Sequence, residues 1–152
     1  MSDPALRDAT PADLPALLAL EAQFPGDRMS ARQYRRHLAS PRARIRVAER
    51  DGTLAGASVL LFRAGSATAR LYSLIVAPTR RGQGLGRQLL EDAESLARAH
   101  GCTRLRLEVR ADNPAALALY ERAGYLRIAR LPGYYDDGGD GWRLEKPLRR
   151  HP

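Results

Sequence analysis

The sequence predicts a mixed α/β (α+β) fold, in which a mostly antiparallel central sheet is flanked by about four helices. Three observations support this class. Apolar, β-branched runs alternate with segments of helical periodicity. An Asp-Gly dipeptide joins two of the runs in the manner of a β-hairpin. The two later helical segments lie between strands, which favours parallel neighbours around them. We expect residues 1–152 to form a single domain, because a chain of this length buries a proper core.

The first segment is predicted to be a short strand followed by a helix. Leu6–Ala9 is the candidate strand. Thr10-Pro11-Ala12-Asp13 then has the pattern of a capping box with proline at the first helical position. The helix would run to about Gln23, because Phe24-Pro25-Gly26-Asp27 breaks the pattern.

A second helix is predicted over Ala31–Leu38. Ser30 and Gln33 repeat the capping signal at its start. The helix would end before Ser40-Pro41, because the residue before a proline disfavours the helical region.

A hairpin and a central strand follow. Ile45–Glu49 and Leu54–Phe62 are the two predicted strands of the hairpin, and Asp51-Gly52 between them suits the left-handed torsions of a type I′ turn. Leu71–Val76 is an apolar and aromatic run that indicates a buried strand, and Pro78 stops it.

The last third of the chain alternates between helices and strands. A helix after the central strand would reach His100, with Gly101 as its C-terminal cap. Leu105–Val109 alternates as a strand, and Asn113-Pro114 opens another helix that ends at Gly124. The final strands are Tyr125–Arg130 and Trp142–Leu148, separated by the glycine- and aspartate-rich loop Pro132–Gly141.

A glycine-rich loop, Gly82-Gln83-Gly84-Leu85-Gly86, leads from the central strand into a helix. The first turn of a helix leaves backbone N–H groups unpaired, and glycines let an anion approach them closely. Arg80, Arg81 and Arg87 add positive charge. The nucleotide P-loop is excluded because no Gly-Lys-Ser/Thr is present, and the glycine spacing does not match the dinucleotide fingerprint. The loop therefore predicts a site for another phosphate carrier, unless it only turns the chain.

The composition restricts the possible partners. The net charge of +8 would favour polyanions, but the arginines are spread along the chain, so nucleic acid is not expected as the main ligand. Cys102 is the only cysteine, so no intramolecular disulfide can form, and we expect a cytoplasmic protein. Cys102 precedes a predicted strand, so we expect it to be a core residue. His37, His100 and His151 are scattered, so no metal site is expected. No apolar run approaches the about 18 residues of a membrane span.

The order of elements and four motifs resemble the GNAT superfamily of N-acetyltransferases over nearly the whole chain. The motifs are Val76-Ala77-Pro78, Arg81–Gly86, Asn113 and Tyr120–Tyr125. The family's Q/R-x-x-G-x-G/A loop receives the pyrophosphate of acetyl-coenzyme A, and here Arg81, Gly84 and Gly86 occupy its defining places. The resemblance implies a GNAT-like fold and acetyl-CoA as the cosubstrate.

The same resemblance implies a set of cofactor-binding residues. The strand Leu74–Val76 would offer its backbone to the pantetheine arm, the segment Gly82–Arg87 would hold the pyrophosphate, and Asn113 would contact the cofactor beyond it. The implied residues are Leu74, Ile75, Val76, Arg81, Gly82, Gln83, Gly84, Leu85, Gly86, Arg87 and Asn113.

Within the superfamily, the chain is most similar in pattern to the RimI-type ribosomal-protein alanine N-acetyltransferases. The stretches that carry this similarity are Leu107–Asn113, Ala118–Glu121 and Gly133–Tyr135. It implies that the acceptor is the primary amine of a peptide or protein N-terminus. Two alternatives stay open: an enzyme that acetylates a small-molecule amine, and a non-catalytic module that senses coenzyme A or binds RNA.

Glu108 is the candidate general base. A protonated amine cannot attack a thioester until it loses a proton. Glu108 lies on the strand after the cofactor helix, with Leu107 and Val109 facing the other side, so its carboxylate would project into the cleft. The alternative is an exposed strand glutamate paired with Arg106 or Arg110.

Tyr120 is the candidate general acid, because a hydroxyl group can return a proton to the leaving thiolate. The alternative is a packing role beside Leu117. A break in strand pairing beside Val76 would also free a backbone N–H to polarise the acetyl carbonyl.

The acceptor groove is expected near the C-terminal loop. Tyr134, Tyr135 and Trp142 would line it together with the segment Phe24–Tyr34, unless the aromatic residues only pack the end of the sheet. Three arginines in or beside that segment predict a carboxyl-poor groove that favours a neutral or acidic peptide over a polycation: Arg28, Arg32 and Arg35.

Overall fold

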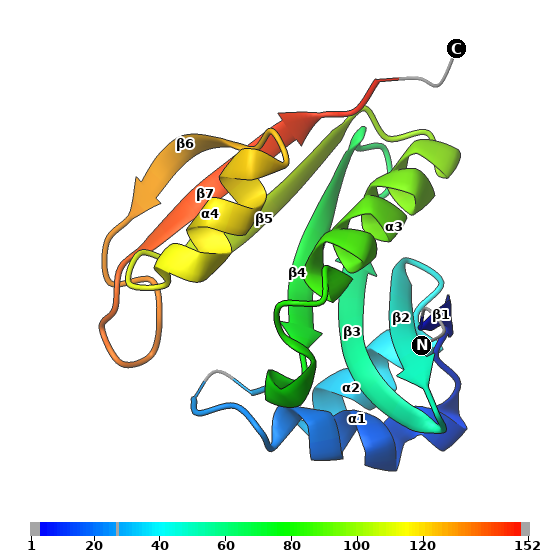
Figure 1. Cartoon of the computed structure of the whole chain (residues 1–152). Coiled ribbons are helices and arrows are strands. Elements are labelled where there is room, and N and C mark those ends of the chain that lie inside the picture. The colour runs from blue at the N-terminus through cyan, green and yellow to red at the C-terminus, as the bar shows by residue number, and fades with distance from the viewer. Residues whose placement is uncertain (1–3, 27, 150–152) are drawn as a thin grey trace.

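A seven-stranded mixed sheet forms the centre of the computed structural model, which describes residues 4–26 and 28–149 (Figure 1). His151 lies outside these residues. The strand order is β1-β2-β3-β4-β5-β7-β6, and β4–β5 is the one parallel pair among the described strands. The strands are β1 (Ala5–Asp8), β2 (Ala43–Arg50), β3 (Thr53–Leu61), β4 (Thr68–Val76), β5 (Arg104–Arg110), β6 (Leu126–Leu131) and β7 (Gly141–Pro147). The helices are α1 (Leu14–Glu21), α2 (Ala31–Ala39), α3 (Leu85–Ala99) and α4 (Pro114–Arg122). The predicted class and order of elements are confirmed.

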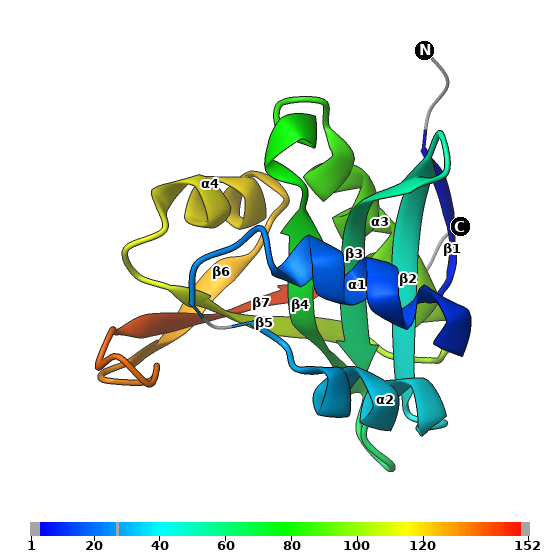
Figure 2. The same ribbon diagram turned by 90° about the horizontal axis from the view of Figure 1, so that it is seen from below.

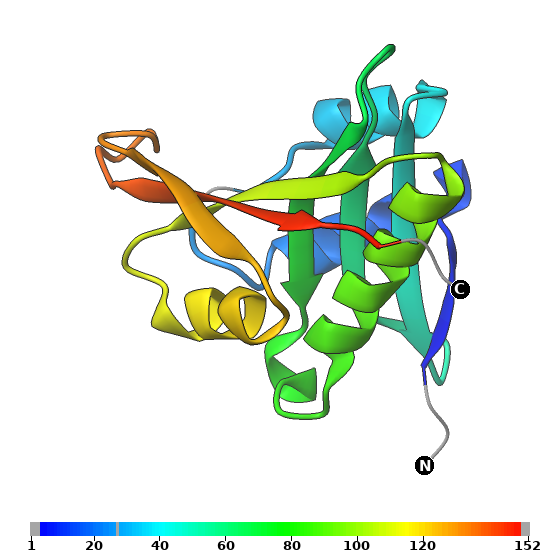
Figure 3. The same ribbon diagram turned by 90° about the horizontal axis from the view of Figure 1, so that it is seen from above.

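The four helices are divided between the two faces of the sheet. Helices α1 and α2 cover β2, β3 and part of β4 on one face (Figure 2), and α3 and α4 lie on the other (Figure 3). Leu17 and Leu20 of α1 and Tyr34 of α2 pack against Val47 and Val59 in the first core layer. The strand residues alternate between the two layers, as the period of a strand requires.

The start of the first helix differs from the prediction. Residues Pro11–Asp13 form a 3-10 turn, and the α-helix begins only at Leu14. Pro15 has no N–H to donate to the Pro11 carbonyl, so Leu14 donates to it instead in the tighter 3-10 pattern. The predicted capping box is present, with the Thr10 N–H donating to the Asp13 carboxylate at 2.7 Å.

The predicted turn between β2 and β3 is confirmed. Asp51 has φ +54° and Gly52 has φ +75°, and Arg50 pairs with Thr53 across the two-residue loop. Both torsions are those of a type I′ turn, which matches the twist of the strands that it joins.

Strands β4 and β5 separate partway along their length. Their parallel pairing runs from Thr68 and Arg104 to Leu71 and Leu107, and among the described residues it goes no further. Strand β5 continues beside β7 as far as Arg110, while β4 continues beside β3 as far as Val76. Figure 1 shows the resulting V-shaped opening in the sheet.

A β-bulge at Tyr72 lies where the opening begins. Val59 pairs with Ser73 and Leu60 pairs with Leu71, so Tyr72 is an extra residue on β4. The bulge keeps Leu71 and Leu74 on the face that α3 covers, although they are three residues apart. Arg70, Tyr72 and Ser73 then line the opposite face.

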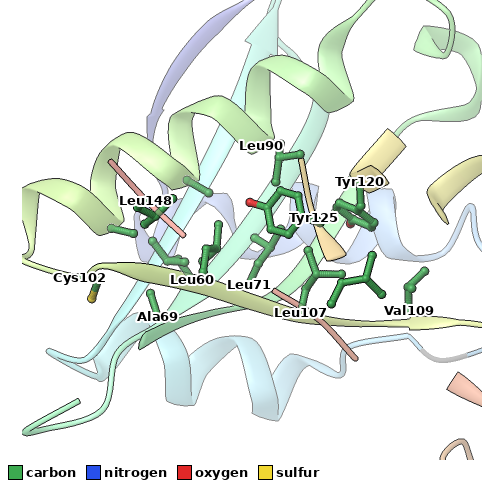
Figure 4. Packing of buried hydrophobic residues seen from close by; sticks show 14 of the residues in the cluster. Leu60, Ala69, Leu71, Leu90, Cys102, Leu107, Val109, Tyr120, Tyr125 and Leu148 are labelled. Atoms are coloured by element: carbon green, nitrogen blue, oxygen red, sulfur yellow. The ribbon is translucent and has the colours of Figure 1, made fainter. Parts of the chain in front are cut away.

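The larger core layer lies under α3 and α4 and supports the opening from one side (Figure 4). Leu71 and Leu107 meet there at the last paired position of β4 and β5. Tyr120 and Tyr125 pack edge to face in the same layer, with ring centroids 5.8 Å apart. Cys102 is buried in this layer as predicted, and burial raises the pKa of its thiol.

Candidate active site

A groove on the α3/α4 side of the V-shaped opening holds most of the predicted cofactor residues. Its volume is about 430 Å³. Strand β4, the start of α3 and the helix α4 each contribute to its walls. We call it the cofactor groove, and its lining includes Leu74, Ile75, Val76, Arg81, Gly86, Asn113, Leu119 and Tyr120.

The glycine loop precedes α3 and contributes Gly86 to one wall of the groove. Gly82 and Gly84 have φ of +80° and +77°, conformations that other residues adopt only with strain. Gly84 is the N-cap of α3, so the backbone N–H groups of the first turn lie directly after it. A side-chain atom added at Gly86 would lie 3.4 Å from Leu119, so this glycine keeps the space between α3 and α4 open.

The other predicted loop residues lie outside the lining of the groove. The Leu85 side chain is buried in the core, so only its backbone faces the loop. The Gln83 amide oxygen accepts a hydrogen bond from Arg50 at 3.0 Å. Arg87 lines a neighbouring cavity with Arg122 and pairs with Glu91 of its own helix at 3.0 Å.

Asn113 has a structural role as well as a place in the groove. Its side-chain oxygen accepts a hydrogen bond from the Ala116 N–H at 3.1 Å, which makes it the predicted N-cap of α4. Pro114 follows at the first helical position. The cap fixes the start of α4 against the opening in the sheet.

Tyr120 reaches the cofactor groove from α4 and is buried, with 8% of its surface exposed. Desolvation raises the pKa of its hydroxyl well above the usual value, and the nearby Tyr135 raises it further. The phenol is therefore protonated at neutral pH, as a proton donor must be. The predicted packing role is also present, because Tyr120 belongs to the core layer with Leu117.

A backbone N–H group at the end of β4 points into the opening. The Ala77 N–H donates to the Ala55 carbonyl at 2.8 Å, so it points toward β3. Adjacent residues of a strand direct their N–H groups to opposite edges, so the Val76 N–H points into the opening. This orientation agrees with the predicted role of a carbonyl-polarising donor.

A second groove of about 400 Å³ lies on the other face of the opening. The α1–α2 connection, β4, β5 and the β6–β7 loop surround it. We call it the acceptor groove, and its lining includes Arg28, Gln33, Arg70, Tyr72, Glu108, Tyr134, Tyr135 and Asp136.

Glu108 is held at the floor of the acceptor groove by two arginines that the sequence analysis did not identify. Arg70 contacts carboxylate Oε1 at 2.7 Å and Arg143 contacts Oε2 at 3.2 Å. The Glu108 side chain is only 6% exposed. The predicted alternative partners, Arg106 and Arg110, pair with other carboxylates. Two nitrogens of Arg70 contact Oε1, whereas Oε2 has the single contact with Arg143 and keeps a lone pair for a further donor, such as an amine or a water molecule.

The register of the strands could have revealed Arg143. Glu108 pairs directly with Arg143 across the β5–β7 ladder, so their side chains lie on one face. The same register explains why Trp142 was wrongly assigned to the acceptor groove. Trp142 pairs with Val109, which faces the core, and its ring packs under the guanidinium groups of Arg127 and Arg130.

The N-terminal side of the acceptor groove differs in part from the prediction. Arg28 lines it, and its guanidinium donates to the Phe24 carbonyl. Tyr34 is instead fully buried and donates to Glu21 at 2.6 Å, while Phe24 lines the cofactor groove, 5.7 Å from the Arg81 guanidinium.

The expected carboxyl-poor character of the acceptor groove is wrong. Glu108 and Asp136 both line it. Arg32 and Arg35 are exposed on α2 and do not contribute to its lining. The sequence could not show this because the β6–β7 loop carries Asp136 back to the groove from a distant part of the chain.

Within residues 4–26 and 28–149, no three His, Cys, Asp or Glu side chains are grouped so that they could hold a metal ion. In the same ranges no helix has both the length and the hydropathy of a membrane span.

Comparison with known proteins gives a consistent result. Residues 14–125 match the profile of the family described as acetyltransferase (GNAT) family. The N-alpha-acetyltransferase RimI of Mycobacterium tuberculosis is 35% identical over 142 residues, which cover 90% of this chain and 88% of that protein.

Solved structures give the same family of folds. The ribosomal-protein-S18-alanine N-acetyltransferase of Escherichia coli superposes with a TM-score of 0.86 at 28% identity, covering 97% of this chain and 96% of that one. A chain of the NatC complex bound to Gag peptide and CoA gives a TM-score of 0.82 at 25% identity, covering 97% of this chain and all of that one.

Proposed function

Because this chain belongs to the GNAT family of acetyltransferases, we propose that it transfers the acetyl group of acetyl-CoA to the α-amine of a peptide or protein N-terminus. Its relatives are N-acetyltransferases, which supports the same activity for this chain. The names of the relatives support an N-terminal acceptor, since RimI of M. tuberculosis is an N-alpha-acetyltransferase and the E. coli enzyme acts on an alanine of a ribosomal protein.

The observation that carries the proposal is the position of the two grooves on opposite faces of one opening. The cofactor groove contains Tyr120, and the acceptor groove contains Glu108. Two substrates that enter from opposite faces would meet between β4 and β5, and such positioning removes much of the entropic barrier to a two-substrate reaction. A direct transfer in a ternary complex needs this arrangement.

The residues of the cofactor groove fit acetyl-CoA. The glycine loop and Arg81 would hold the pyrophosphate at the start of α3, where unpaired N–H groups favour an anion. The strand Leu74–Val76 would run beside the pantetheine arm, with Asn113 opposite. When bound, acetyl-CoA supplies the acetyl group as a thioester.

Glu108 and Tyr120 would move the protons. Glu108 would accept a proton from the α-amine, directly or through water, so that the nitrogen lone pair can form the new C–N bond. Tyr120 would donate a proton to the sulfur as the C–S bond breaks, and the Val76 N–H would stabilise the developing charge on the carbonyl oxygen. The amine proton thus leaves on one face of the opening and the thiol proton is supplied from the other.

The proposal extends to the whole chain. Strands β6 and β7 follow the segment that matches the family, yet they belong to the same sheet and supply Arg143 and the loop with Tyr134. We therefore treat residues 1–152 as one N-acetyltransferase domain. A cytoplasmic location agrees with the single buried thiol at Cys102.

Binding of acetyl-CoA should raise the thermal midpoint of the protein. A ligand selective for the folded state at a hundred times its Kd stabilises it by about 2.7 kcal/mol, which corresponds to several degrees. Gly86→Leu should abolish the shift, because Gly86 is helical and the new side chain would fill the groove without backbone strain.

Ala99→Leu is the matched control, since it adds the same side chain to the exposed end of the same helix. It should keep the full shift. If acetyl-CoA shifts neither the native protein nor the control, the cofactor assignment fails.

A further inference from the structure

A second cavity, rich in arginine, adjoins the acceptor groove. Its volume is about 270 Å³, and it contains no carboxylate among its lining residues. Arg70 lines both the cavity and the acceptor groove, so the two are neighbours on this face of the sheet. We call it the arginine pocket, and its polar lining is Arg63, Ser66, Thr68, Arg70 and Arg106.

The sheet itself builds this pocket. Arg70 and Arg106 are partners in the parallel register of β4 and β5, so their side chains lie on the same face. Glu108 follows two residues later on that face of β5. In Figure 1, helices α1 and α2 lie toward the open end of the V, away from the end where β4 and β5 begin. The guanidinium groups therefore stand beside the site where the amine would react.

The arginine pocket contains hydrogen-bond donors that lack acceptors. The Arg106 Nε is buried and has no hydrogen-bond partner, with the nearest carboxylate oxygen, from Glu145, 3.7 Å away. Glu145 forms its closer contact, 2.9 Å, with Arg104. Among the described residues, the Arg63 guanidinium has no ion-pair or hydrogen-bond partner. The Arg106 side chain is 40% exposed, so its terminal guanidinium nitrogens can bind the carboxylate of a ligand together with the exposed Arg63.

We propose that the arginine pocket binds an acidic side chain at the second or third residue of the acceptor peptide. The inference rests on the proposed function, because it places the peptide N-terminus at Glu108. An extended chain advances about 3.3 Å per residue, and Arg106 lies two residues from Glu108 along β5, or about 7 Å. A peptide that runs from the acceptor groove past Arg70 brings its second or third side chain to Arg106 and Arg63.

The test compares peptides that share a free N-terminal alanine and differ only in residues two and three. Asp, Asn and Lys at these positions give an acidic, a neutral and a basic set. The Asp peptides should have a kcat/KM about five- to tenfold above the Asn peptides at low salt. The difference should lie in KM, because the pocket is remote from the reacting atoms.

Substitution of the pocket arginines should remove this preference. Arg106→Gln and Arg63→Gln should bring the ratio of Asp to Asn peptides close to one and leave the Asn peptides unchanged. Arg35→Gln is the control, because it removes the same charge from an exposed position of α2 that does not line the pocket. It should keep the ratio.

Three results would overturn the inference: a ratio of one in the native protein, a preference for Lys, or an equal loss in the Arg35 variant. Binding of RNA to the arginine pocket would be a separate outcome. If a single-stranded RNA oligonucleotide binds and Arg106→Gln weakens it while the peptide ratio is one, the pocket serves RNA and the peptide assignment is wrong. If no peptide with a free N-terminus is acetylated, the proposed function itself fails.

Discussion

Glu108 has a structural role as an ion-pair partner between strands and a proposed chemical role as the general base. Its carboxylate is shared between Arg70 of β4 and Arg143 of β7, so it ties together three strands at the point where the sheet opens. The same two contacts fix the direction of its oxygens toward the acceptor groove. A general base benefits from such fixation, because the rate depends on the geometry of the proton transfer.

Glu108→Gln should lower kcat/KM about a hundredfold at neutral pH, the usual size of a general-base contribution. The deficit should shrink above about pH 8, because an α-amine with a pKa near 8 then loses its proton to solvent. A pH–rate profile for a peptide acceptor measures both effects. Glu49→Gln is the control, since Glu49 also pairs with an arginine, Arg7, across two strands but lines neither groove. Parental rates at all pH values would reassign Glu108 to a purely structural role.

Tyr120→Phe should lower kcat about a hundredfold and leave the KM for acetyl-CoA within about twofold, because the ring and its packing remain. Burial raises the pKa of Tyr120, so its protonated form persists as the pH rises and kcat of the native enzyme should show no alkaline decline through pH 10. Tyr125→Phe changes the neighbouring ring and should affect stability but not kcat. An alkaline decline that the Tyr120→Phe substitution removes would contradict this account.

The helix caps and turns are the elements that the sequence predicted best. The Ser30–Gln33 capping box, the Asp51-Gly52 turn and the Asn113 cap all form as expected, because each depends on contacts between residues a few positions apart. The start of the first helix was predicted less accurately. Its start depends on Pro15, whose missing N–H converts the first turn to 3-10 geometry.

The cap of the first turn also predicts a pH dependence of stability. Hydrogen bonds from Arg7 lower the pKa of Asp13 to about 2. The folded-state pKa thus lies below the unfolded value of about 4, so the stabilisation is present above pH 4 and is lost as the pH falls toward 2. Asp13→Asn should lower the free energy of unfolding by about 1 kcal/mol at pH 7, since the partly exposed Arg7 is screened by solvent. Urea unfolding at pH 7 and near pH 2 measures this. A difference that stays constant between the two pH values would contradict it.

At the scale of the whole molecule, the decisive feature is the opening between β4 and β5. The sequence predicted the strands on both sides and the glycine loop at one end, because these depend on local pattern. It predicted the side of β5 on which Glu108 lies, since a strand alternates with a period of two. It did not predict the bulge at Tyr72 or the partners Arg70 and Arg143, which depend on the register between strands.

The opening also explains why the site needs distant parts of the chain. Apart from Phe24, the cofactor groove is formed by consecutive elements from β4 to α4, and most of the predicted cofactor residues line it. The acceptor groove combines the α1–α2 connection with the β6–β7 loop, more than 90 residues apart, and its charge was predicted wrongly. Tertiary contacts of this separation have no signature in a single sequence.

The most direct test of the central claim is the steady-state release of coenzyme A with four acceptors. These are a short peptide with a free N-terminus, the same peptide with its N-terminus blocked, spermidine, and an aminoglycoside. Acetylation of an α-amine between the two grooves predicts turnover of the free peptide and none of the blocked peptide. The net charge of +8 predicts poor turnover of the two polycations, because the protein repels them. Efficient turnover of spermidine or the aminoglycoside with no activity on the free peptide would contradict N-terminal acetylation.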